Sequence, residues 1–180
     1  MAILAGVLGL AVGSFLNVVI YRVPIKKSII EPPSACPHCA SQIRSYDNIP
    51  LVSWILLRGK CRNCHEAISI RYPLVELSTG LFFGIVTWKF LPLGSHANFL
   101  LFAFLYLAAI TVALGLIDMD THTLPNSIVI PSYFVGAILL GVAGITTGEH
   151  WAIFRSLIGA ATMWLLSGYG TCLSGRDGIW

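Results

Sequence analysis

Long hydrophobic runs, broken by short polar segments, are the main pattern along this chain and predict membrane-spanning helices. Each run contains few charged residues, and most are long enough to cross about 30 Å of hydrocarbon as a helix. The second run is slightly short, and the last contains Arg155. We therefore expect an all-α polytopic membrane protein with about five transmembrane helices. The five runs are residues 1–20, 74–90, 97–117, 128–146 and 152–167.

The composition supports a membrane protein over a soluble one. Hydrophobic residues make up 56% of the 180 residues, charged residues 11%, and the mean hydropathy is +0.80. A typical soluble domain carries about 25% charged residues. A soluble protein with so few charges would expose apolar patches and aggregate.

The basic residues are concentrated between residues 21 and 73, and this distribution predicts the topology. Lys and Arg accumulate in cytoplasmic loops, so we expect the amino terminus outside and residues 21–73 in the cytoplasm. This segment lacks interleaved basic and aromatic residues, so we expect no nucleic-acid partner. The predicted division is a first span (1–20), a cytoplasmic cysteine-rich segment (21–73), a membrane core (74–167) and a cytoplasmic tail (168–180).

Two pairs of glycines have the G-x-x-x-G spacing of closely packed membrane helices. They are Gly9 with Gly13, and Gly80 with Gly84. Small residues at this spacing let two helix backbones approach each other. The pattern predicts a helix bundle but no particular activity.

Two cysteine pairs predict a metal site in the cytoplasmic segment. Each pair has the C-x2-C spacing, and two such pairs supply the four thiolates of a tetrahedral, zinc-ribbon-like site. Because a site with four protein ligands has no open position, we expect a structural zinc ion. An iron site of the rubredoxin type has similar cysteine spacing and is an alternative to zinc. The four ligands are Cys36, Cys39, Cys61 and Cys64.

Disulfides and redox chemistry explain the cysteines less well. Disulfides would require an extracytoplasmic loop, against the charge distribution. A thioredoxin-like pair would require a βαβ context, which the sequence lacks. The fifth cysteine, Cys172, is isolated in the sequence, and we expect a free thiol.

Acidic residues at the ends of the predicted spans are candidates for catalysis. Asp118 ends the long third run, and a partly desolvated carboxylate there is suited to proton transfer. The alternative is an ordinary aspartate at a helix end. Asp120 would point away from Asp118 on a continuing helix and is a weaker candidate. Glu76, near the start of the second run, is expected to pair with a basic residue or to line the site.

Several segments, in this order, resemble the bacterial prepilin leader peptidase family. The resemblance covers most of the chain, and the two cysteine pairs also follow the family's order. The segments are residues 13–24 (GSFLNVVIYRVP), 47–54 (DNIPLVSW), 71–77 (RYPLVEL), 117–120 (IDMD) and 124–126 (LPN).

The resemblance implies a polytopic aspartic endopeptidase of the bacterial inner (cytoplasmic) membrane. Members of this family remove the basic leader of type IV prepilins and of type II secretion pseudopilins. They then methylate the new amino terminus with S-adenosylmethionine. Asp118 matches the first of the family's two catalytic aspartates. Residues 141–144 (GVAG) do not form a dinucleotide-binding fingerprint, so S-adenosylmethionine is implied by the resemblance alone.

The chain departs from the family pattern near its end. The second catalytic aspartate of the family lies in a G-x-G-D sequence after a stretch like residues 175–178, and the chain ends at Trp180. Asp177 matches the acidic residue before that motif. We therefore expect a peptidase truncated before its second aspartate, with little activity as a 180-residue chain.

Two other functions stay open. The first is a non-catalytic membrane scaffold, whose zinc knuckle binds a partner in pilus or type II secretion assembly. The second is a membrane-tethered electron carrier of the rubredoxin type, which would contain iron.

Overall fold

The computed structural model describes residues 1–91, 98–148 and 158, and the regular secondary structure in these residues is helical. The described residues contain no named strand; two isolated β-bridges lie in the segment that contains the cysteines, which otherwise consists mainly of turns and irregular backbone. The expected all-α fold is confirmed. The last predicted span, residues 152–167, lies outside the described residues apart from Ile158. The elements are α1 (Ala2–Arg22), η1 (Ser45–Asn48), α2 (Val52–Leu56), α3 (Arg71–Phe90), α4 (Asn98–Thr121) and α5 (Asn126–Thr147).

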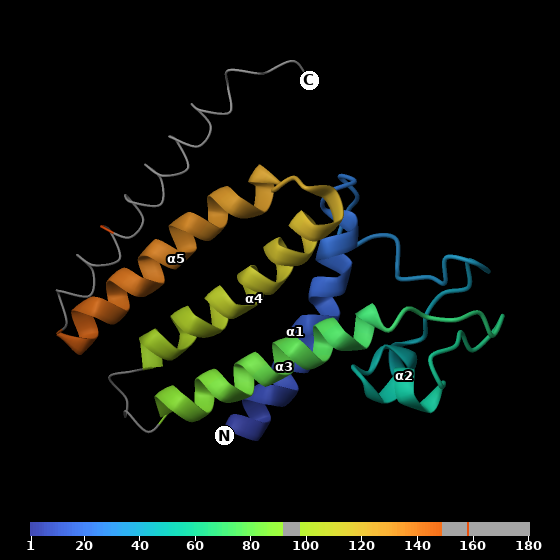
Figure 1. The fold of residues 1–180 in the computed structure, drawn as a ribbon, viewed down its shortest axis with the longest axis horizontal. Coiled ribbons are helices and arrows are strands. Elements are labelled where there is room, and N and C mark those ends of the chain that lie inside the picture. Colours follow the sequence, from blue (N-terminus) through green and yellow to red (C-terminus); the bar gives the residue numbers. More distant parts are fainter. Residues whose placement is uncertain (92–97, 149–157, 159–180) are drawn as a thin grey trace, which may run out of the picture.

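The four long helices form a bundle with the cysteine-rich segment at one end (Figure 1). α1 packs most extensively on α3, α4 packs on α5, and α4 also contacts both α1 and α3. The connection 23–70 and the connection 122–125 lie at the same end of the bundle, where α1 and α4 end and α3 and α5 begin. The alternation expected from the sequence requires this arrangement.

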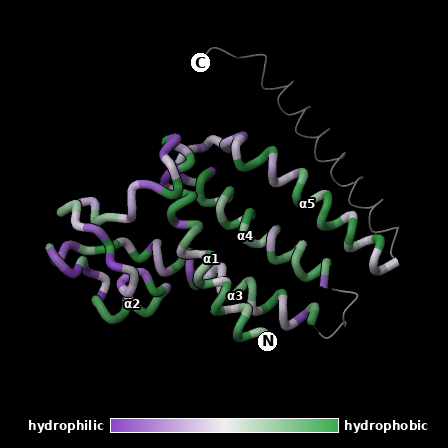
Figure 2. Tube along the Cα trace, turned by 180° about the vertical axis from the view of Figure 1, so that it is seen from behind, coloured by the Kyte–Doolittle hydropathy of each residue, from purple (hydrophilic) through white to green (hydrophobic). Residues whose placement is uncertain are grey.

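Three of these helices are long and apolar enough to cross a membrane. They are α1, α4 and α5, over Ala2–Arg22, Asn98–Thr121 and Asn126–Thr146. α3 has 20 residues but is less apolar, since it contains Arg71, Glu76 and Lys89. Figure 2 shows hydrophobic residues along the helices and mostly hydrophilic ones in the cysteine-rich segment. The chain is a multi-pass membrane protein.

Glycines bring α1 and α3 into backbone contact, as the G-x-x-x-G spacing predicts. A Cβ atom added to Gly9 would lie 2.9 Å from the Cα of Gly80, and one added to Gly13 would lie 2.7 Å from the Cα of Glu76. Neither space admits a methyl group without displacing a backbone. Gly84 is less crowded, because its nearest neighbour would be the carbonyl oxygen of Ala2 at 3.7 Å. The close contact is therefore centred on Gly9, Gly13 and Gly80.

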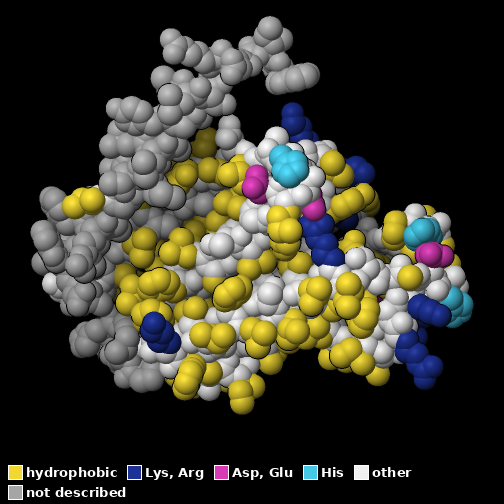
Figure 3. All heavy atoms as spheres, in the orientation of Figure 1, with side chains coloured by type: hydrophobic (Ala, Val, Ile, Leu, Met, Phe, Trp, Pro, Cys, Tyr) yellow, Lys and Arg dark blue, Asp and Glu magenta, His cyan; other side chains and the backbone are white. Residues whose placement is uncertain are grey.

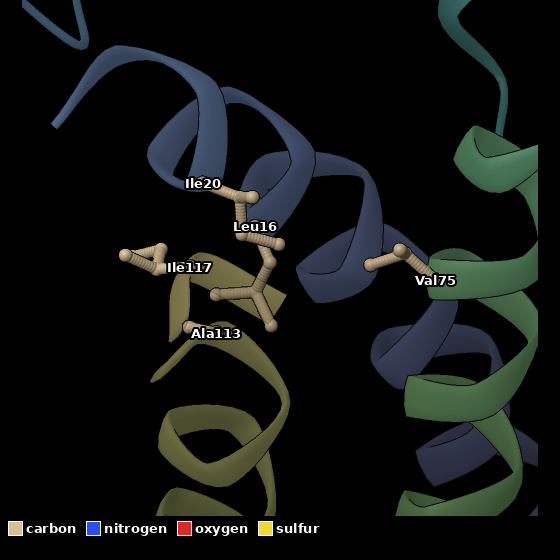
Figure 4. Close-up of a cluster of buried hydrophobic side chains, with 5 residues drawn as sticks. All are labelled: Leu16, Ile20, Val75, Ala113 and Ile117. Carbon is tan, nitrogen blue, oxygen red and sulfur yellow. The ribbon is translucent and has the colours of Figure 1, made fainter. Parts of the chain in front are cut away.

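The buried core is small and lies near the end of the bundle that carries the cysteine-rich segment. It joins α1, α3 and α4, and Ile117 in it is fully buried (Figure 4). Most large hydrophobic side chains instead lie on the outside, as expected where lipid is the solvent. Because Ile117 precedes Asp118, this core fixes the end of α4. Its members are Leu16, Ile20, Val75, Ala113 and Ile117.

We predict that Gly13→Leu separates α1 from α3. The new side chain would meet the backbone of Glu76, and overpacking of this kind costs about 1–3 kcal/mol. Gly115→Leu is the matched control, because a Cβ at Gly115 has no neighbour within 4 Å among the described residues. Unfolding in lipid–detergent mixtures measures the difference. Equal stability of the two variants would contradict the close α1–α3 contact.

Candidate functional site

The four cysteines of the two C-x2-C pairs come together in one cluster. Their sulfur atoms all lie within 4.8 Å of one another, and the Sγ atoms of Cys36 and Cys64 are 3.8 Å apart. Thiolates at about 2.3 Å from a zinc ion at the centre of a tetrahedron lie about 3.8 Å from each other. Cys36 is buried, whereas Cys39 and Cys64 are exposed. The cluster therefore fits a tetrahedral metal ion bound near the surface of the segment.

The backbone around the first pair forms a tight knuckle. The N–H of Cys36 donates to the carbonyl oxygen of Ser41 (3.0 Å), and the N–H of Ala40 donates to the carbonyl oxygen of Cys36 (2.9 Å). A β-bridge between Ala35 and Gln42 closes the turn. Ala40 has φ +56°, a left-handed conformation that reverses the chain directly after the second ligand.

The second pair repeats this geometry. The N–H of Cys61 donates to the carbonyl oxygen of Glu66 (2.8 Å), and the N–H of His65 donates to the carbonyl oxygen of Cys61 (3.0 Å). Lys60 and Ala67 form the closing bridge, and His65 has φ +59°. The sequence shows two similar spacings, but only the structure shows that the two turns are equivalent knuckles facing one another.

Local hydrogen bonds favour ionised thiols at part of this cluster. Hydrogen bonds from the side chain and backbone of Ser41 lower the pKa of Cys39 to about 6. Backbone hydrogen bonds at Cys64 and Asn63 lower the pKa of Cys61. The hydrogen bond from the backbone of Glu66 lowers the pKa of Cys64, but partial desolvation and the hydrogen bonds with the other three thiols together outweigh it and raise this pKa to about 12. Four thiols this close ionise together only when a cation offsets their charge, and a bound metal ion would provide that positive charge.

A polar network joins the segment between the pairs to the second knuckle. The guanidinium of Arg62 donates to both carboxylate oxygens of Asp47, from Nε (2.9 Å to Oδ2) and from Nη2 (2.5 Å to Oδ1). This contact lowers the pKa of Asp47. The guanidinium carbon of Arg62 also lies 5.4 Å from the ring centre of Tyr46, and Arg44 donates a hydrogen bond to the Tyr46 hydroxyl. Asp47, the first residue of the DNIP sequence, is thereby tied to the second knuckle.

Glu76 connects the cysteine-rich segment to the membrane helices. The N–H of Leu51, just before α2, donates to Oε2 of Glu76 on α3 at 2.8 Å. The glutamate is 8% exposed, so its carboxylate is desolvated and this bond contributes more than an exposed one. Sequence reasoning expected a basic partner or a lining role for Glu76. A backbone amide is the partner that the structure provides.

Two further contacts join the helices at the same end of the bundle. The side-chain amide of Asn17 on α1 donates to the carbonyl oxygen of Tyr72 on α3 at 3.1 Å. The guanidinium of Arg71 on α3 donates to both carboxylate oxygens of Asp120 on α4, at 2.7 and 2.6 Å. Residues 71–77 therefore contact three of the other segments that resemble the family, although these are far apart in the sequence: residues 13–24, 47–54 and 117–120.

Asp118 and Asp120 have different surroundings at the end of α4. The helix continues to Thr121, so the two side chains point in nearly opposite directions. The carboxylate of Asp120 is held by Arg71, whereas Asp118 is exposed and no side-chain hydrogen bond or ion pair reaches it from the described residues. Of the two, Asp118 is the carboxylate available to a ligand.

Sequence reasoning missed the ion pair of Arg71 with Asp120 and the backbone partner of Glu76. The signal for the first is that both charged residues lie at helix ends that antiparallel neighbours bring together. The second partner, a main-chain N–H, leaves no signal in the residue types. Arg155, Cys172 and Asp177 lie outside the described residues.

We predict that the double variant Cys36→Ser, Cys61→Ser loses the bound metal, because one ligand is removed from each knuckle. Metal analysis of the purified protein measures the zinc or iron per chain. Cys172→Ser is the control and should keep the wild-type content. Unchanged metal content in the double variant would contradict a four-cysteine site.

We also predict that Glu76→Leu releases the segment around Leu51 while the metal stays bound. A hydrogen bond to a carboxylate contributes about 1.5–3 kcal/mol, so protection of the Leu51 amide should fall roughly ten- to hundredfold. Hydrogen exchange measures this loss, and the exposed Glu31→Leu is the control. Wild-type protection in Glu76→Leu would mean that the contact does not hold the segment.

Comparison with known proteins agrees with these motifs. Residues 7–90 match the bacterial peptidase A24 N-terminal domain. The prepilin leader peptidase/N-methyltransferase of Neisseria gonorrhoeae is 38% identical over 98% of this chain and 68% of that protein. The protein of the same description from Myxococcus xanthus is 43% identical over 91% of this chain and 46% of that protein. That from Stutzerimonas stutzeri is 37% identical over 96% of this chain and 66% of that protein.

The matches extend through both parts of the described fold, the helices and the cysteine-rich segment. The chain spans between about half and two thirds of the length of these relatives. No solved structure matches it. By its motifs, their contacts and these identities, the chain belongs to the prepilin leader peptidase/N-methyltransferase family.

Proposed function

We propose that this chain forms the amino-terminal and central part of a membrane aspartic endopeptidase that cleaves the leaders of type IV prepilins and pseudopilins. The observation that carries the proposal is the meeting of the motif segments at one end of the bundle, next to an unpaired Asp118. The names of the relatives support the same activity.

Asp118 supplies one carboxylate of the catalytic pair in this proposal. In an aspartic peptidase, one carboxylate takes a proton from the attacking water while the other donates a proton to the oxygen of the scissile carbonyl. A group in this role has to be free to contact substrate, and Asp118 has that freedom among the described residues. The buried Ile117 beside it keeps its backbone in place.

The second carboxylate does not come from Asp120 in this proposal. Both oxygens of Asp120 accept hydrogen bonds from Arg71, which keeps the group ionised and turned towards α3. By its resemblance, the family provides the partner in a G-x-G-D sequence that follows the segment of residues 175–178. A single carboxylate cannot supply both proton transfers, so the proposed mechanism needs a second carboxyl group close to Asp118.

The metal has a structural role in this proposal. Four thiolates complete the coordination of zinc, so the ion offers no position to a substrate, and its chemistry is to hold the two knuckles together. S-adenosylmethionine would supply the methyl group for the new amino terminus. Its assignment rests on the names of the relatives, and the described residues contain no dinucleotide-binding fingerprint.

The proposed orientation places the catalytic end in the cytoplasm. Basic residues of the segment 21–73 favour that side, and the amino terminus of α1 then lies outside the inner membrane. Prepilin leaders are also cytoplasmic. The proposed parts are the first span (1–20), the metal-binding segment (21–73), the membrane core (74–167) and the tail (168–180).

The proposal predicts that Asp118→Asn abolishes leader cleavage. The substrate is a purified prepilin mixed with membranes that contain either this chain or this chain joined to the carboxyl-terminal part of a relative with the G-x-G-D sequence. We expect cleavage by the joined protein and a loss of at least about a thousandfold in its Asp118→Asn variant, since the amide cannot take a proton. Glu31→Gln, an exposed charge removal on the connection 23–70, should leave cleavage unchanged.

Two outcomes would contradict this proposal. Cleavage that survives Asp118→Asn would remove Asp118 from the catalytic pair. No cleavage by the joined protein, although it is folded and contains metal, would favour the non-catalytic scaffold in pilus or secretion assembly.

A further inference from the structure

The short helix α2 has an exposed apolar face that the metal site does not require. Val52, Ile55 and Leu56 are 49%, 64% and 76% exposed. Their positions i, i+3 and i+4 place them on one side of the helix. Ile49, just before the helix, is also exposed, at 49%. Exposed large apolar side chains grouped in this way indicate a binding surface.

The other side of α2 is held firmly in the cysteine-rich segment. The hydroxyl of Ser53 donates to the carbonyl oxygen of Tyr46 at 2.9 Å, and Nε1 of Trp54 donates to the carbonyl oxygen of Ile68 at 3.2 Å. The ring of Trp54 also lies close to Gly59, which has φ +67° and no room for a side chain. The apolar face is therefore turned outwards by fixed contacts on the inner face.

The start of α2 lies beside the membrane helices. Leu51, its N-cap, donates to Glu76, which is five residues into α3. At 1.5 Å per residue, Glu76 is about 7.5 Å along the helix axis from Arg71, towards the membrane interior. Figure 1 shows α2 next to the first turns of α3. α2 therefore lies near the level where α3 enters the membrane.

The apolar surface of α3 continues towards α2. Ile70, Leu74 and Leu77 at the start of α3 are exposed, and Figure 3 shows hydrophobic side chains extending from the helices onto the cysteine-rich segment. In Figure 2, the chain around α2 is hydrophobic within a largely hydrophilic segment. The lipid-facing surface of the bundle and the face of α2 thus belong to one apolar region.

The charges next to α2 are complementary to anionic lipid. Arg58 and Lys60 follow the helix and are exposed, and residues 49–60 contain no acidic residue. Apolar side chains flanked by basic ones are typical of segments that lie in the interface of a membrane with negatively charged headgroups.

We propose that α2 lies in the interface of the bilayer. Val52, Ile55 and Leu56 enter the boundary between headgroups and acyl chains, and Arg58 and Lys60 contact anionic headgroups. The metal-binding segment is thereby held against the membrane surface at two places, through Glu76 on α3 and through lipid. This inference depends on the membrane helices and not on peptidase activity. It can therefore fail while the proposed function holds, and it can hold while the proposed function fails.

The test measures where α2 lies relative to lipid. An environment-sensitive fluorescent amino acid replaces Leu56 or, as the matched control, Asn63, which is exposed between the second pair of cysteines. Each protein is placed, one chain per nanodisc, in phosphatidylcholine and phosphatidylglycerol with brominated acyl chains. We expect blue-shifted emission and several-fold stronger bromine quenching at position 56 than at position 63. Metal content equal to wild type shows that each labelled protein is folded.

The contribution of charge is measured in the Leu56-labelled protein. Arg58→Gln with Lys60→Gln should reduce the extra quenching that phosphatidylglycerol gives over phosphatidylcholine alone. The control, Lys26→Gln with Lys27→Gln, removes the same amount of charge elsewhere in the segment. It should leave the extra quenching in phosphatidylglycerol unchanged.

Three results would overturn the proposal. One is a probe at position 56 that is as accessible to an aqueous quencher as the probe at position 63. Another is shielding that appears only with two chains per nanodisc, which would identify a second copy as the occupant. The third is shielding that appears only when prepilin is added, which would identify a polypeptide.

Discussion

The backbone contact between α1 and α3 at glycine is the constraint on which the rest of the structure depends. Gly13 lets the backbone of Glu76 approach, and Glu76 in turn accepts the hydrogen bond from Leu51 that positions α2. A side chain at position 13 would therefore disturb both the packing of α1 on α3 and the attachment of the cysteine-rich segment to α3. Packing between small residues is a main source of helix association in lipid, where burial of apolar surface gives little advantage.

Part of this chain faces lipid and part faces water, and the charged residues lie mainly in the part that faces water. The helices expose hydrophobic side chains along most of their length, whereas charged groups gather mainly at the end that carries the cysteines (Figure 3). Charges close to the membrane have specific partners there: Asp120 pairs with Arg71, and Glu76 accepts a backbone N–H. Asp118 stands apart because it has no such partner among the described residues.

The cysteine-rich segment is small and has no large hydrophobic core among its described residues. Two equivalent knuckles, the Asp47–Arg62 contact and the inward-facing Ser53 and Trp54 provide its order. Small domains of this kind need a metal or covalent links, because too little apolar surface is buried to offset the loss of chain entropy. A structural ion is consistent with the sparse packing.

The sequence by itself determined the all-α membrane fold, the four cysteines of the cluster and the presence of closely packed helices, whereas the pairing of α1 with α3 came from the structure. Long apolar runs, C-x2-C spacing and G-x-x-x-G spacing are local patterns whose physical meaning depends little on the rest of the chain. Helix ends were less well predicted: α3 begins at Arg71 rather than Leu74, since lipid-buried and interfacial turns belong to one helix. Only the tertiary structure decided that Arg71 holds Asp120, that a main-chain N–H satisfies Glu76, and that α2 lies beside α3. These contacts join residues 25 to 49 positions apart, and which of many charged or backbone groups meet over such distances depends on how the helices pack.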